Sequence, residues 1–367
     1  MKRLISLLLA VMMMASFMAF GSFSAAAAVE DAANDPAVTL SVASAFTSTQ
    51  LIGQFWEYFK EDVEELSGGS ITLDLYLGGT LCGPDEELAM LSNGSIDMMM
   101  AFTPANAFSI PALASIYYTP GSIEDTQKVV NYILFEDEAS AKVVEDTFAA
   151  NNATLLPSFI VTSEMVFAST QPITCWADMY EGKYGCPMDA NYTDMGYKNL
   201  VTVIDTDWYE SLRTGLCDSI NPTAADVVNN KIYEVADYYL VCPANRVDNW
   251  MLINTDSFNA LTDNQKEVLS QACEDLLAYS AQVENELNDQ FVDVVTENGG
   301  TVIDMTDEEF EWFLYCGDIL GWKTGLETLA VATDCVDEMA VVQAANREGM
   351  NLYTEYDFDA LEAKYAE

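Results

Sequence analysis

The sequence predicts an α/β protein made of two lobes. Between residues 38 and 102 the apolar positions switch between a period of two and a period of about 3.6, so strands alternate with helices. A second group of strand candidates follows residue 150, and then comes one helical pattern too long for a small domain. This alternation favours a layered fold with a parallel sheet. About 340 residues after an export signal suggest two domains.

The first group of elements is marked by clear start and stop signals. Apolar residues alternate with polar ones in two stretches, as in half-buried strands, while Phe55, Phe59 and Val63 follow helical spacing. Pro84, with three acids after it, marks a helix start. We expect strands at 38–42, 71–77 and 96–102, and helices at 55–66 and from 84 to the stop at Asn93-Gly94.

The second group leads into the long helix. Thr262 and Gln265 form a capping box, and the apolar residues after them keep the helical period until Asn298-Gly299. This helix has roughly 35 residues and a length of about 50 Å, so we expect it to cross both lobes. A second capping box, Thr306 to Glu309, opens another helix. The other expected elements are strands at 155–161, 165–168, 200–204, 238–242 and 249–253, and a short helix at 207–214.

Residues 1–28 have the order of a secretory signal peptide. Lys2 and Arg3 precede an apolar run from Leu4 to Phe20, and four alanines follow, so cleavage near Val29 is expected. A membrane anchor is the alternative, but the run is short for a bilayer span. We therefore expect an exported, periplasmic or otherwise extracytoplasmic protein.

The composition limits the possible functions. A formal net charge of −45 opposes nucleic acid and anionic lipid, which both need a basic surface. The chain has no histidine, so it lacks the usual general base and the commonest transition-metal ligand. The acids of Asp307 to Glu309 could form a catalytic pair, but the first turn of a helix already explains them. We expect no enzyme, no cofactor and no metal site.

Eight cysteines in an exported protein predict disulfides. Their spacing matches no zinc pattern. The pairs that we favour are Cys175–Cys186, Cys217–Cys242 and Cys316–Cys335.

Several segments together resemble one family. The run GGSITLDLYLGGTLCGPDEELAMLSNGSIDMMM, residues 68–100, is similar to the N-terminal signature of solute-binding proteins of tripartite ATP-independent periplasmic (TRAP) transporters. Pro172-Ile173 followed by Asp178 and Gly182 matches a further family segment. YESLRTGLCDSINP, KIYEVADYYL and LTDNQKEVL then follow in the family's order. The resemblance covers roughly residues 36 to 320.

The resemblance implies a two-lobed periplasmic binding protein fold with crossing strands and a domain-spanning helix. Such proteins, which are not enzymes, close around a small solute and deliver it to the membrane permease subunits of a TRAP transporter. We expect a monomer. Residues 36–160 plus about 246–280 would form lobe I, and 161–245 plus about 281–367 lobe II. A sensor that presents its ligand to a membrane receptor is the alternative role.

The chain departs from the family where arginine usually binds a carboxylate solute. A guanidinium suits this task because its planar fork of donors matches a carboxylate. The segment GKYGCP is expected to form a turn, and Gly185 stands at that position in it. Glu164 stands at or beside a second family arginine. Asp205 occupies the place of an aromatic residue, whereas Asn221 keeps the family's asparagine.

These departures favour a cationic, zwitterionic or neutral solute over a simple carboxylate. Glu164 and Asp205 would supply negative charge, although both could equally face solvent. Arg246 offers another route, because arginine is rare in this chain: if it faces the cleft, it would bind an organic acid, or a zwitterion together with Glu164. The aromatic residues that could contact a cation, or simply form core, are Trp208, Trp250 and Tyr117 or Tyr118.

Overall fold

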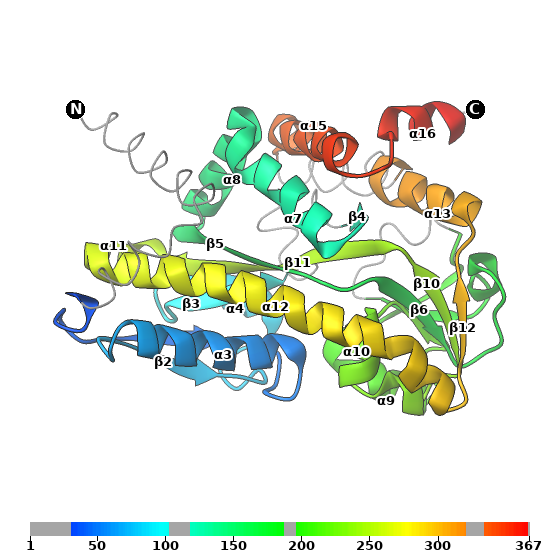
Figure 1. Ribbon diagram of the computed structural model, residues 1–367, viewed down its shortest axis with the longest axis horizontal. Helices are drawn as coiled ribbons and strands as arrows, with labels where there is room; N and C mark the ends of the chain where they lie inside the picture. Colours follow the sequence, from blue (N-terminus) through cyan, green and yellow to red (C-terminus); the bar gives the residue numbers. More distant parts are fainter. Residues whose placement is uncertain (1–30, 103–117, 187–195, 321–333, 366–367) are drawn as a thin grey trace.

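The protein has two mixed β-sheets joined by crossing strands and spanned by one long helix (Figure 1). The computed structural model describes residues 31–102, 118–186, 196–320 and 334–365. The predicted signal peptide, residues 1–28, lies outside this range. Within the described ranges, no helix is both long and apolar enough to cross a bilayer.

The first sheet has the strand order β2-β1-β3-β11-β4, and β5 also pairs with β11. β1 runs parallel to β2 and β3, as predicted. β11 is antiparallel to β3, β4 and β5, so the sheet is mixed, and the expectation of a parallel sheet holds only for its first three strands. The strands are β1 (Val38–Ala43), β2 (Ile71–Tyr76), β3 (Met98–Phe102), β4 (Tyr118–Pro120), β5 (Ala153–Val161) and β11 (Ala244–Asn254).

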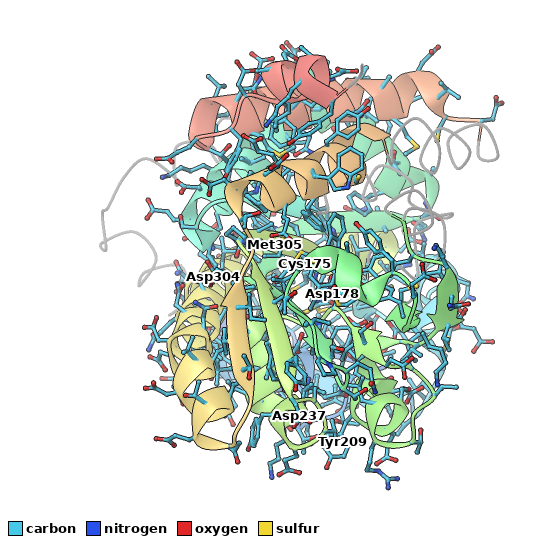
Figure 2. The ribbon with its side chains drawn as sticks, turned by 90° about the vertical axis from the view of Figure 1, so that its right-hand side faces the viewer. Cys175, Asp178, Tyr209, Asp237, Asp304 and Met305 are labelled. Atoms are coloured by element: carbon cyan, nitrogen blue, oxygen red, sulfur yellow. The ribbon has the colours of Figure 1, made fainter. Side chains whose placement is uncertain are left out.

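The second sheet has the order β12-β10-β6-β9-β7-β8. Figure 2 looks onto its β12 edge, with Asp304 and Met305 at the upper end of β12 and Asp237 at the lower end. The backbone N–H of Thr301 donates to Asp237 O at 2.8 Å, which fixes the start of β12 beside β10. The strands are β6 (Met165–Ser169), β7 (Lys183–Cys186), β8 (Asn199–Thr202), β9 (Ser219–Ile220), β10 (Tyr238–Cys242) and β12 (Thr301–Asp304).

Helix α12 (Asp263–Glu297) connects the two halves of the molecule. It has 35 residues and starts with the predicted capping box, in which Thr262 accepts from Gln265 N. Leu269 and Leu276 are buried in the core that also covers β1, β2 and α3 (Leu51–Leu66), whereas Phe291 and Val295 are buried against the second sheet. Figure 1 shows the helix running across both sheets, so the prediction of a domain-spanning helix is confirmed.

The other helices cover the sheets. α15 packs on α7 and α8, and Figure 1 places these three helices with α13 and α16 on the side of the molecule opposite α3, α9 and α10. They are α4 (Pro84–Ser92), α7 (Ile123–Asn131), α8 (Glu138–Ala150), α9 (Trp208–Arg213), α10 (Ala224–Asn229), α11 (Thr255–Ala260), α13 (Asp307–Leu314), α15 (Val336–Tyr353) and α16 (Phe358–Tyr365). Short 3₁₀ or π turns lie at Tyr132–Glu136, Trp176–Met179, Asp205–Asp207, Ile232–Glu234 and Tyr315–Leu320.

Besides α12, which leads from β11 to β12, two short connections carry the chain between the sheets. One is the short link from β5 to β6, and the other is Pro243 between β10 and β11. The links are hydrogen-bonded to each other: Thr162 N donates to Arg246 O at 3.0 Å, and Arg246 N donates to Thr162 Oγ1 at 3.0 Å. This double contact fixes the start of β11, and with it Arg246, at the crossing point.

The predicted disulfides are not present. Cys175, Cys217 and Cys242 are free thiols, which excludes Cys175–Cys186 and Cys217–Cys242, and no bond joins Cys316 to Cys335. Cys217 and Cys242 are both fully buried, and burial raises the pKa of each thiol. Buried cysteines of this kind are unreactive and pack in the core as small apolar side chains, without a disulfide.

Candidate functional site

A cleft lies where the two sheets meet, at the start of α3. Its cavity volume is about 40 Å³, well below the roughly 300–1,000 Å³ of small-molecule sites, so the two sides would have to move apart to admit a solute. Its wall combines one guanidinium and three carboxylates with amide, hydroxyl and apolar groups. The lining residues are Phe46, Gln50, Leu51, Ile52, Ile160, Thr162, Asp205, Asp226, Asn230, Arg246, Asn249 and Glu284.

Arg246 is the cation of the cleft, and it is only 3% exposed. Its Nη1 donates to Asn221 O at 3.4 Å, and its Nη2 lies 3.9 Å from Asp226 Oδ2. The guanidinium carbon is 5.9 Å from the centre of the Trp208 ring, within the range of a cation–π contact. Each of the two polar contacts is longer than the 2.7–2.9 Å of a strong charge-assisted hydrogen bond.

Asp226 is positioned by the start of α10. It is the N3 residue of a capping box with Thr223, whose Oγ1 donates to Asp226 Oδ2 at 3.0 Å, and Asn230 Nδ2 donates to Oδ1 at 3.2 Å. The side chain is 20% exposed. Burial raises the pKa of Asp226, while the charge of Arg246 acts in the opposite direction. These bonds fix the carboxylate before any solute enters.

Glu284 joins three elements at the floor of the cleft. It projects from α12, is 2% exposed, and accepts a hydrogen bond from Ser163 N at 2.8 Å. Ser163 Oγ in turn accepts from Ala225 N at 3.0 Å. One buried carboxylate therefore links the long helix, the β5–β6 crossing and α10.

The two sides of the cleft contact each other near its mouth. Gln54 Nε2, on α3, donates to Asn229 Oδ1, on α10, at 3.2 Å. Asn229 Nδ2 donates back to Thr49 O at 3.1 Å. Because α3 packs on the first sheet and α10 adjoins the second, these bonds hold the sides together.

Two buried polar atoms beside Arg246 have no hydrogen-bond partner among the described residues. One is Trp208 Nε1, in a side chain that is 2% exposed, and the other is Asn221 Oδ1, in a residue that is 4% exposed. The amide nitrogen of Asn221 is occupied, since it donates to Val166 O at 3.2 Å. Neither residue is part of the cleft lining.

Four of the predicted site residues lie at or next to the cleft. Arg246 and Asp205 line it, and Trp208 and Asn221 contact the Arg246 side chain. Asp205 opens the 3₁₀ turn that precedes α9. Their roles in binding stay predictions, but the structure brings them together.

The other predicted residues lie elsewhere. Glu164 does not line the cleft. Burial and the nearby charge of Asp304, which Figure 2 shows at the upper end of β12, raise the pKa of Glu164. Trp250 is fully buried in the core, 5.8 Å from the Phe159 ring. Tyr117 lies outside the described residues, and Tyr118 pairs with Arg246 across β4 and β11.

Gly185 belongs to strand β7 rather than to a turn. A Cβ atom there would lie 3.0 Å from Cys217 Sγ and 3.1 Å from Ile220 Cγ2, so the position is closed by core packing. The structure has no room for a side chain that would point from Gly185 into the cleft without moving this core.

Most polar residues of the cleft were not predicted from the sequence. Thr223 and Asp226 do form a recognisable capping box, which could have placed a carboxylate at the start of a helix after Pro222. No comparable signal singles out Glu284, because it lies on a long helix with many exposed acids. The others missed are Gln50, Thr162, Asn230 and Asn249.

Comparison with known proteins identifies the family. The family described as bacterial extracellular solute-binding protein, family 7, matches residues 42–314. A solute-binding protein of Sulfitobacter sp. strain NAS-14.1 is 22% identical over 246 residues, covering 66% of this chain and 74% of the relative.

Solved structures share the fold. A TRAP periplasmic solute-binding protein of Sulfitobacter sp. NAS-14.1 with bound β-D-galacturonate has a TM-score of 0.68 at 17% identity, covering 84% of this chain and all of that one. A Bordetella pertussis extracytoplasmic solute receptor binding pyroglutamic acid has a TM-score of 0.72 at 17% identity, covering 85% and 100%. With its two sheets, crossing strands and spanning helix, and with the family match over residues 42–314, this chain belongs to the TRAP transporter solute-binding proteins of family 7.

Proposed function

We propose that the protein binds a small carboxylate-bearing solute in the cleft and delivers it to TRAP permease subunits in the membrane. The observation that supports this most is Arg246, a guanidinium that is 3% exposed and lies on the cleft wall. A buried charge of this kind is stabilised strongly by a partner of opposite charge.

The solute chemistry expected from the sequence needs revision. The case for a purely cationic solute relied on Glu164, on Asp205, which does line the cleft, and on the loss of arginine. Glu164 lies outside the lining, and Arg246 is part of it. Two structural relatives bind galacturonate and pyroglutamic acid, which are both organic acids. Together these points favour the alternative, organic-acid binding through Arg246.

The wider cellular role follows from the family. An exported, monomeric receptor with residues 1–28 removed would pick up solute outside the cytoplasm and release it to the permease. Lobe I would comprise residues 36–160 and about 246–280, and lobe II residues 161–245 and about 281–367. Helix α15, from the lobe II range, packs on α7 and α8 from the lobe I range. Solute uptake into vesicles that contain the permease subunits tests this role. Uptake that does not depend on the protein would contradict it.

Arg246→Gln tests the proposed contact. Removing one partner of a buried charge pair costs about 2–5 kcal/mol, so we expect affinity for any bound organic acid to fall at least about thirtyfold. Arg213→Gln is the matched control, because Arg213 is 54% exposed and pairs only with Glu210 among the described ion pairs. Calorimetric titration of both variants measures the effect. Equal affinity of Arg246→Gln and the parent would refute the contact.

A further inference from the structure

We propose that the cleft selects solutes that carry a carboxylate and a positively charged nitrogen, and that Asp226 binds the nitrogen. This inference rests on the proposed function, because it takes Arg246 as the carboxylate site. It goes further by assigning the opposite pole to Asp226 and by excluding dicarboxylates and other purely anionic acids as the preferred solute.

The charges on the cleft wall support a dipolar solute. The lining holds one guanidinium, from Arg246, and three carboxylates, from Asp205, Asp226 and Glu284. A plain carboxylate would neutralise the guanidinium and leave the acids facing a further negative group in a partly desolvated space, where like charges repel strongly. A nitrogen cation on the same solute removes this repulsion.

The geometry brings the two poles side by side. Arg246 Nη2 and Asp226 Oδ2 are 3.9 Å apart, wider than a hydrogen bond but close enough for one small molecule to reach both. A solute with its charges one or two carbon atoms apart would form two adjacent ion pairs, each with a protein partner of opposite sign. The capping bonds from Thr223 and Asn230 hold the Asp226 carboxylate in place for this contact.

Asp226 is the best placed of the three acids. Glu284 is already engaged by Ser163 N, and Asp205 starts the turn before α9. Asp226 Oδ2 lies 3.9 Å from Arg246 Nη2, within ion-pair distance. Burial raises its pKa, so a cation beside it would stabilise the ionised form.

Matched solute pairs provide the test. Each pair shares a carboxylate and differs in the charge of its nitrogen: L-proline with pyroglutamate, L-alanine with N-acetyl-L-alanine, and β-alanine with its N-acetyl derivative. Ethylamine serves as an amine without a carboxylate. Succinate and galacturonate serve as purely anionic probes. Calorimetric titration of the mature protein near neutral pH should show at least one charged-nitrogen member binding about tenfold or more tighter than its partner.

The variant Asp226→Asn should abolish that preference, because it removes the charge and keeps an oxygen for the Thr223 hydroxyl. Glu164→Gln is the control, since this carboxylate lies outside the cleft lining, and it should keep the preference. If Asp226→Asn does not fold, titration of the matched solute pairs against the parent protein decides whether a charged nitrogen is preferred.

The outcomes separate this inference from the proposed function. If carboxylates bind whatever the charge on their nitrogen, and Arg246→Gln abolishes binding, the proposed function stands and the role of Asp226 is refuted. If an amine without a carboxylate binds as well as an amino acid, or if Arg246→Gln changes nothing, the carboxylate site itself is refuted. A folded protein that binds no member of the panel contradicts both.

Discussion

Glu87 makes the stability of the protein depend on pH in a way that the structure predicts. It lies in the first turn of α4 and is 3% exposed. One carboxyl oxygen, Oε1, has no hydrogen-bond partner among the described residues, and the only stabilising contact on its charge is with the backbone of Ala45. Burial raises the pKa of Glu87 from its ordinary value near 4.5 to about 8. The folded protein therefore holds this proton at neutral pH.

The sign of the effect follows from the proton count. Between the two pKa values the unfolded chain has released the proton and the folded chain has kept it, so the free energy of unfolding falls as pH rises. The slope is about 1.4 kcal/mol per pH unit, and the loss by pH 8 is about 4 kcal/mol. Below the pKa that Glu87 has in the unfolded chain, both states hold the proton, so Glu87 causes no loss of stability. The neutral isostere Glu87→Gln removes the titrating group.

Urea unfolding between about pH 5 and pH 8 measures this difference. We expect Glu87→Gln to match the parent within about 1 kcal/mol at the acid end and to be about 3–4 kcal/mol more stable at the alkaline end. Glu86→Gln is the control, since Glu86 is the exposed neighbour on the same helix. Parallel pH curves for the parent and Glu87→Gln would refute the reasoning.

Three further predictions concern the helices around the cleft. Burial and the charge of Asp275 raise the pKa of Asp62, which lies between α3 and α12, to about 6. The folded chain keeps this proton at a pH where the unfolded chain has released it, so the free energy of unfolding falls as pH rises toward 6. After allowance for solvent screening, Asp62→Asn should be about 1–2 kcal/mol more stable than the parent near neutral pH, and urea unfolding with no such gain would contradict this. Asn229→Ala removes the bonds with Gln54 and Thr49 that join α10 to the start of α3. Solute affinity should fall about threefold to thirtyfold at nearly unchanged melting temperature, and unchanged affinity by titration would exclude a role for these bonds in binding. Leu276, on α12, is fully buried. Leu276→Ala should cost about 2–5 kcal/mol in urea unfolding, and a loss below about 1 kcal/mol would show that this side chain contributes little.

Local signals made most of the fold predictable. The capping boxes at Thr262 and Thr306 placed the starts of α12 and α13 at the observed residues, because a side-chain cap fixes a helix end within one turn. Strand β7 was expected as a turn, since its glycine and following proline favour turns. The structure makes it a strand because β8 and β9 pair with it on either side and Tyr184 is fully buried.

The site was predictable only where composition made a residue conspicuous. Arg246 stood out because arginine is rare in a chain with 59 acids. The same abundance concealed Asp226 and Glu284, since one acid among so many carries no signal of which way it faces. Glu164 was placed by counting along the family pattern, and the tertiary arrangement puts it beside Asp304 instead. Which acid reaches the cleft is decided by how β6, α10 and α12 pack together.

A crystal structure of the mature protein with a bound panel solute tests the central claim most directly. We predict the solute carboxylate within about 3 Å of the Arg246 guanidinium, in the cleft between α3 and α10. A solute bound in that cleft without contact to Arg246, or bound beside Glu164 and β12, would contradict it.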